Sequence, residues 1–149
     1  YNGELFIDNA VRTEGKLELT ENVSETCQNY AAFFEIFTKE ENPRFYQTLT
    51  WKFGAFFAKD EYPNVHPSNM FIGYILRLMI LFREEEYELL LRECKVKFGE
   101  MAKRTGTIWE LFAENASCNH GFGSVVGKLI VESVEAIKNK EKGVIEWKK

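Results

Sequence analysis

Cysteine and histidine are both scarce in this sequence. The three cysteines, Cys27, Cys94 and Cys118, lie far apart and form no Cys-x-x-Cys pair, and only His66 and His120 could join them as metal ligands. This spacing argues against a disulfide framework and against a zinc site. We therefore interpret the cysteines as buried thiols, which favours a reducing, cytoplasmic compartment.

A surplus of positive charge and a long apolar run are also missing. Lys and Arg number 19 against 23 Asp and Glu, a net charge of −4, so nucleic acid is not an expected partner. The longest apolar stretch, Met70 to Phe82, is interrupted by Arg77 and is too short to cross a bilayer, so no membrane span is expected. The sequence has no glycine-rich phosphate loop and no cluster of metal ligands, and we expect no metal site.

What is present is enough apolar material for a hydrophobic core. The chain has 149 residues, of which 45% are hydrophobic and 28% charged, the size and composition of about one globular domain. It begins at Tyr1 rather than at Met, in a loop-like stretch. We therefore expect residues 1–149 to be one segment of a processed or longer product.

Helical periodicity dominates after residue 22, whereas the preceding residues are strand-like or irregular. Ser24 has the chemistry of an N-cap, and Pro43 suits the first turn of a helix. Residues at i, i+3, i+4 and i+7 predict that the first helix buries one apolar face, made of Tyr30, Phe33, Phe34 and Phe37. The expected helices cover residues 24–38, 43–57, 70–82, 84–104 and 121–134.

Short loops between successive helices are typical of antiparallel helical hairpins. The predicted fold class is therefore all-α. In the last helix Gly123 and Gly127 lie one turn apart, where bare backbone would let a neighbouring helix approach closely.

One loop concentrates residues that could carry chemistry. It lies between the fourth and fifth predicted helices and contains Trp109, Glu110, Ser117 and His120. A carboxylate beside an indole suits proton transfer, and an indole can stack on a sugar. His120 at a helix N-terminus would stay neutral and could donate or accept a hydrogen bond. Local physics leaves three alternatives open: Trp109 as a core anchor, Glu110 as a surface or capping carboxylate, and His120 as a satisfied loop residue.

The same loop resembles a known family. Thr107-Ile108-Trp109-Glu110, followed by Ser117-Cys118-Asn119-His120 and then Ser124, is similar to the Thr-x-Trp-Glu and Ser-x-x-His-x-x-x-Ser signature of α-L-rhamnosidase-like six-hairpin glycosidases. A less specific likeness covers roughly Gly3 to Val134 and includes the helix start at Ser24 to Asn29.

The resemblance implies an (α/α)6 barrel and hydrolysis with inversion at the anomeric carbon. It implies that Glu110 is the general base that activates water, that His120 contacts the sugar, and that Trp109 forms a wall of the sugar pocket. The implied partner is a rhamnoside-like carbohydrate, and no organic cofactor is expected.

The general acid of the family has no counterpart in this sequence, because the upstream Asp- and Arg-rich motif that carries it is absent. An inverting site needs two carboxyl groups roughly 6.5 to 9.5 Å apart, and five helices cannot close a ring of twelve. The sequence therefore predicts the C-terminal part of a larger catalytic domain, inactive alone and partnered by the remainder of that domain. The alternative is a non-catalytic helical-hairpin module that binds carbohydrate or mediates another interaction.

Overall fold

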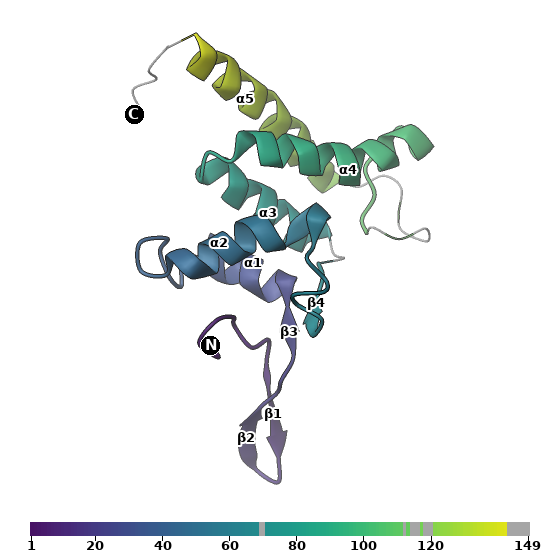
Figure 1. Cartoon of the computed structure of the whole chain (residues 1–149). Coiled ribbons are helices and arrows are strands. Elements are labelled where there is room, and N and C mark those ends of the chain that lie inside the picture. The colour runs from purple at the N-terminus through teal and green to yellow at the C-terminus, as the bar shows by residue number, and fades with distance from the viewer. Residues whose placement is uncertain (69–70, 112, 114–116, 118–120, 143–149) are drawn as a thin grey trace. The chain divides into compact units, whose positions relative to one another are not determined.

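A computed structural model describes all residues except 69–70, 112, 114–116, 118–120 and 143–149 (Figure 1), and it describes residues 71, 72 and 122 by their backbone only. The chain divides into two compact units, Tyr1–Arg77 and Leu78–Lys149. The boundary between them falls inside helix α3 (Phe71–Arg83). Each unit contains its own set of buried apolar side chains.

The expectation of an all-α fold is wrong, because the described residues are mixed α/β, with 55% of them in helices, 10% in strands and two small sheets. The described residues also show no toroid, so the barrel implied by the resemblance is not observed. The first unit contains β1 (Ala10–Thr13), β2 (Lys16–Leu19), β3 (Val23–Ser24), α1 (Glu25–Phe33), α2 (Pro43–Lys52), the 3₁₀ turn η1 (Gly54–Phe56), β4 (Val65–His66) and the start of α3. The second contains α4 (Tyr87–Thr105), the 3₁₀ turn η2 (Gly121–Gly123) and α5 (Ser124–Glu141).

Strands β1 and β2 form an antiparallel hairpin, in the region for which the sequence predicts strand-like or irregular structure. The two residues between the strands, Glu14 and Gly15, both have positive φ angles of 49° and 85°. This is the conformation of the two-residue turns whose twist matches that of a hairpin. The second sheet pairs β3 with β4 in parallel. The two strands are far apart in sequence, so no local sequence pattern predicts this pairing.

Helix α1 begins where Ser24 predicts, since Ser24 Oγ accepts a hydrogen bond from the amide of Cys27 at 3.2 Å. It ends earlier than the predicted Thr38 because Glu35 adopts a left-handed conformation with φ 54°. The amide of Glu35 then donates to the carbonyl of Ala32, and the next amide donates to Ala31, which is the Schellman pattern. Glu85, with φ 62°, ends α3 in the same way.

The buried face of α1 is polar, which corrects the predicted aromatic face. Tyr30 is 39% and Phe34 65% exposed, whereas Glu25, Gln28 and Asn29 are almost completely buried. The carboxylate of Glu25 accepts hydrogen bonds from the amides of Gly54 (2.8 Å) and Ser68 (2.7 Å). Gln28 exchanges hydrogen bonds with the backbone of Phe6, and Asn29 donates to the carbonyl of Gly73. Helix α1 therefore holds three separate segments of its unit by their backbones.

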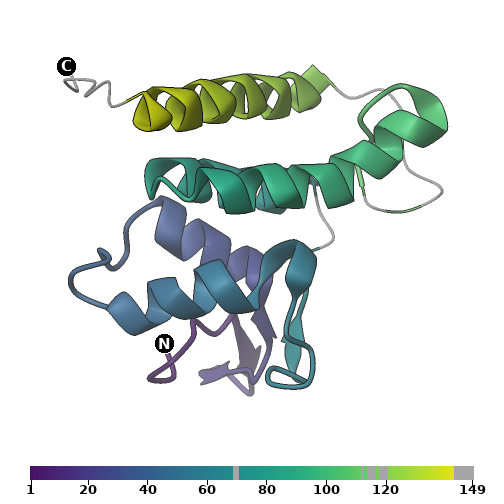
Figure 2. The same ribbon diagram turned by 45° about the horizontal axis from the view of Figure 1, so that its top comes forward.

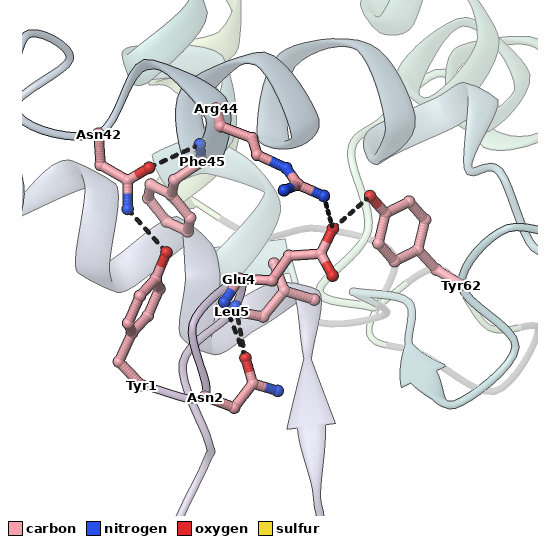
Figure 3. Close-up of polar contacts among 8 residues, drawn as sticks. All are labelled: Tyr1, Asn2, Glu4, Leu5, Asn42, Arg44, Phe45 and Tyr62. Carbon is pink, nitrogen blue, oxygen red and sulfur yellow. Dashed lines mark hydrogen bonds and ion pairs between the residues drawn. The ribbon is translucent and has the colours of Figure 1, made fainter.

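Helix α2 is fixed at both ends. Asn42 caps it by accepting from the amide of Phe45 (3.1 Å), and the same side chain donates to the hydroxyl of Tyr1 at 2.7 Å (Figure 3). At the other end the buried guanidinium of Arg77 donates to the carbonyls of Leu49 and Thr50 in the last turn of the helix. A cation at this position also interacts favourably with the helix dipole.

The second unit contains the candidate site. Helices α4 and α5 lie side by side and run in opposite directions (Figure 2), as expected for a helical hairpin. Leu90, Cys94 and Phe98 of α4 are buried, as are Val126 and Leu129 of α5. The segment between these helices carries the residues singled out from the sequence.

Candidate functional site

Thr105, the last residue of α4, organises the start of the loop. Its hydroxyl donates to the carbonyl of Met101 (3.2 Å) and accepts a hydrogen bond from the indole Nε1 of Trp109 (2.7 Å). The hydroxyl of Thr107 lies 3.0 Å from the same oxygen. Gly106 follows with φ 73°, the left-handed conformation that glycine adopts without strain, so the chain can reverse directly after the helix.

Trp109 is anchored against α4 rather than standing free. Its side chain is 7% exposed, and its backbone amide contacts the sulfur of Met101 at 3.4 Å. The guanidinium carbon of Arg104 lies 4.9 Å from the centre of its ring, a cation–π contact that occupies one face of the indole. Trp109 is therefore a structural anchor, and the exposed edge of its ring borders a cavity.

Glu110 follows this anchor and is exposed to solvent. Its backbone amide donates to the carbonyl of Ser117 at 2.9 Å. This bond joins the two blocks of the signature, which are separated in sequence by the intervening loop. The backbone of Glu110 is therefore held by this hydrogen bond and by the buried Trp109 before it, while its side chain is exposed.

A second contact joins the same two blocks. A Cβ atom added to Gly123 would lie 2.9 Å from Cβ of Ile108, so η2 approaches the Thr107–Glu110 block as closely as bare backbone allows. Gly127 differs, because a Cβ atom there would meet nothing within 4 Å. The sequence predicts that a neighbouring helix approaches both glycines, and this is wrong: Gly123 is close to Ile108, which lies in the loop after α4, and Gly127 has no close neighbour.

A shallow cavity of about 210 Å³ borders Trp109. It is small compared with sites for drug-sized ligands and could take no more than a single sugar ring. Its wall combines an aromatic rim with one carboxylate and two cationic groups, which suits a ligand rich in hydroxyl groups. The lining residues are Val96, Lys97, Glu100, Met101, Arg104 and Trp109.

The structure brings together only part of the predicted set. Trp109 borders the cavity, whereas Glu110 is not among its lining residues, and His120 lies outside the described residues. Sequence reading missed Lys97, Glu100 and Arg104, which lie on α4 rather than in the loop. Their spacing of three and four residues places them on one helix face, a signal that could have pointed to them.

Among the described residues, no group of three or more His, Cys, Asp or Glu side chains could hold a metal ion. Within the same residues, none of the helices combines the length and hydropathy needed to span a membrane. No protein-family model, no curated protein and no solved structure matches the chain.

Proposed function

We propose that this chain is part of a glycoside hydrolase that resembles inverting α-L-rhamnosidases, and that Glu110 is its general base. The observation that carries the proposal is the hydrogen bond from the Glu110 amide to the Ser117 carbonyl, which brings the two blocks of the signature together. A proposal of this kind depends on site residues rather than on overall architecture.

In this mechanism the Glu110 carboxylate removes a proton from a water molecule as the water oxygen attacks the anomeric carbon. The bond from that carbon to the leaving oxygen breaks, and a general acid supplied from outside this chain protonates the leaving group. Trp109 and His120 bind the sugar in the roles that the resemblance implies. The exposure of Glu110 is compatible with the water access that a general base needs.

The first step of the test is to determine the mass and sequence of the native gene product. In that protein, Glu110→Gln should leave the fold intact and reduce turnover of an aryl α-L-rhamnoside by about 10²- to 10⁴-fold. Glu132→Gln is the matched control, because within the described ranges Glu132 forms only an exposed ion pair with Lys128 on α5. Near-normal turnover by Glu110→Gln would refute the base assignment.

A second experiment tests the role of Glu110 more directly. In Glu110→Ala the missing base leaves space for a small anion, so added azide should restore turnover and give a glycosyl azide of inverted configuration. The Glu132→Ala variant should show no such rescue. Failure of azide to restore any turnover, in a variant that folds and binds the substrate, would count against a general base at this position.

The cavity beside Trp109 supports a second candidate function, sugar binding without catalysis, because its lining includes Glu100 but not Glu110. Titration of the chain with L-rhamnose, followed by NMR, distinguishes the two. Shifts of the Trp109 indole N–H that disappear in Glu100→Gln, combined with no hydrolysis by the native product, would favour this candidate.

A further inference from the structure

The β1–β2 hairpin is an exposed arm of the first unit. It projects away from α1 and α2 (Figure 1), and every residue of β2 is exposed, with Leu17 at 68% and Leu19 at 73%. Among the described residues no third strand joins the hairpin. A hairpin of two strands is only marginally stable alone, and its free edges are templates for further strands.

The hydrogen-bonding pattern shows which backbone groups of β2 are free. The amide of Thr20 donates to the carbonyl of Asn9, so this pair is of the hydrogen-bonded type. Because the two types alternate along an antiparallel ladder, Glu18 and Lys16 also bond to β1. The N–H and C=O groups of Leu17 and Leu19 consequently point outward, along the open edge of β2.

The side chains of β2 separate by face. Leu17 and Leu19 lie on one face of the hairpin, and Lys16 and Glu18 lie on the other, since successive residues of a strand alternate. Lys16 and Glu18 form no ion pair within the described part of the chain. The free edge therefore presents two leucines on one side and one charge of each sign on the other.

We propose that two copies of this chain associate through their β2 edges to form a continuous four-stranded antiparallel sheet. The two β2 strands pair about Leu17, so that each Leu17 exchanges both backbone hydrogen bonds with Leu17 of the second copy. In this register Lys16 lies opposite Glu18 of the second copy, and the two-fold symmetry creates this pair twice. The leucines of both copies form one apolar strip on the other face.

Charge selects this register over its neighbour. A shift of two residues would pair Leu17 with Leu19 of the second copy and would place Glu18 directly opposite Glu18. Opposite charges across a non-hydrogen-bonded pair stabilise a sheet, and like charges destabilise it. The sequence Lys-Leu-Glu is thus complementary to itself when it runs antiparallel. This association does not depend on the proposed function.

The charge pattern allows a decisive test by sedimentation equilibrium over a concentration series of the full chain. Lys16→Glu alone and Glu18→Lys alone each create two like-charge pairs, and each should weaken self-association by about tenfold. An equimolar mixture of the two variants should associate as strongly as the native chain, because opposite charges meet again. A native chain that stays monomeric throughout, or a mixture no better than its components, would overturn the proposal.

Proline substitutions locate the edge. Leu17→Pro removes an outward N–H of β2 without removing a bond to β1, and it should abolish association. Ala10→Pro is the matched control, because Ala10 lies opposite Leu19 and its N–H points outward from the other edge of the hairpin. Loss of association in Ala10→Pro but not in Leu17→Pro would assign the contact to β1 and refute the proposal.

Hydrogen exchange gives a measurement that needs no variant. The amides of Leu17 and Leu19 should become protected as the protein concentration rises, whereas those of Ala10 and Arg12 should continue to exchange rapidly. Equal exchange of the leucine amides at all concentrations would contradict the pairing.

Discussion

The indole nitrogen of Trp109 donates a hydrogen bond of 2.7 Å to the hydroxyl of Thr105, which in turn donates to the carbonyl of Met101. One hydroxyl thus joins the last turn of α4 to the aromatic residue that precedes Glu110. This hydrogen bond, together with burial of the ring and its contact with Arg104, fixes the residue directly before the candidate base.

Replacing Thr105 by Val should loosen this anchor while keeping the shape of the side chain. The indole N–H and the Met101 carbonyl lose their partner, which should lower the free energy of unfolding by about 1 kcal/mol. Thr105→Ser keeps the hydroxyl and should be close to the native chain. Urea unfolding measures the stability, and the NMR signal of the Trp109 indole N–H should move in the Val variant only.

The two glycines of the η2–α5 segment should respond in opposite directions to alanine. Gly123→Ala forces Ile108 to move and should destabilise the chain by roughly 1–3 kcal/mol. Gly127→Ala meets open space inside a helix and should stabilise it by roughly 0.5–1 kcal/mol. Equal stabilities of the two variants in urea unfolding would contradict the close contact between Gly123 and Ile108.

Cys94 should make stability depend on alkaline pH. Burial, with a smaller effect of neighbouring Glu93, raises the pKa of its thiol from 9.0 to about 12. Above about pH 9 the unfolded chain loses this proton while the folded chain keeps it. The free energy of unfolding should therefore fall between about pH 9 and 12, by up to about 1.4 kcal/mol per pH unit.

Subtracting the pH profile of Cys94→Ala isolates this contribution from the lysines and tyrosines that titrate in the same range. The difference between the two profiles should be flat below about pH 9 and should slope above it. A flat difference up to pH 12 would show that the thiol is not buried as described.

The left-handed Glu35 predicts a gain in stability on replacement by glycine. A residue with a Cβ atom pays roughly 1–2 kcal/mol in this conformation, and the larger freedom of unfolded glycine offsets part of that. Glu35→Gly should therefore stabilise the chain by about 0.5–1 kcal/mol. Glu35→Ala keeps the Cβ atom and serves as the control for the lost carboxylate, so a thermal unfolding midpoint no higher in Gly than in Ala would contradict the prediction.

Two helix starts were readable from the sequence because their signals are local, whereas α4 and α5 each begin three residues later than predicted. Ser24 and Pro43 act at the predicted positions, and Gly106 ends α4 where the sequence suggested. Helix ends were less readable, since Glu35 and Glu85 occupy positions at which glycine is the usual signal. Helix α5 also continues past the predicted Val134 as far as Glu141, because its polar residues on the outer face interrupt the apolar pattern without interrupting the helix.

The fold class was mispredicted because its deciding contacts are long-range. Nothing local indicates that Val23 pairs with Val65, and the Glu14–Gly15 turn is a weaker signal than Asn-Gly. In the candidate site, the amino-acid types of the loop residues were enough to single them out. Glu100 and Arg104 lie on a face of α4 and line the cavity only because Trp109 packs back against that helix.

The polar buried face of α1 has a consequence for the order of folding. The hydrogen-bond partners of this face are distant in sequence. Phe6 lies 22 residues before Gln28, and the partners of Glu25 lie 29 and 43 residues after it. The partner of Asn29 lies 44 residues after it. A short helix with such a face gains little until those distant backbones arrive, so it cannot act as a local nucleus. The first unit must therefore close long loops before α1 is stable. We expect this unit to fold slowly for a unit with so much helix, and to unfold cooperatively.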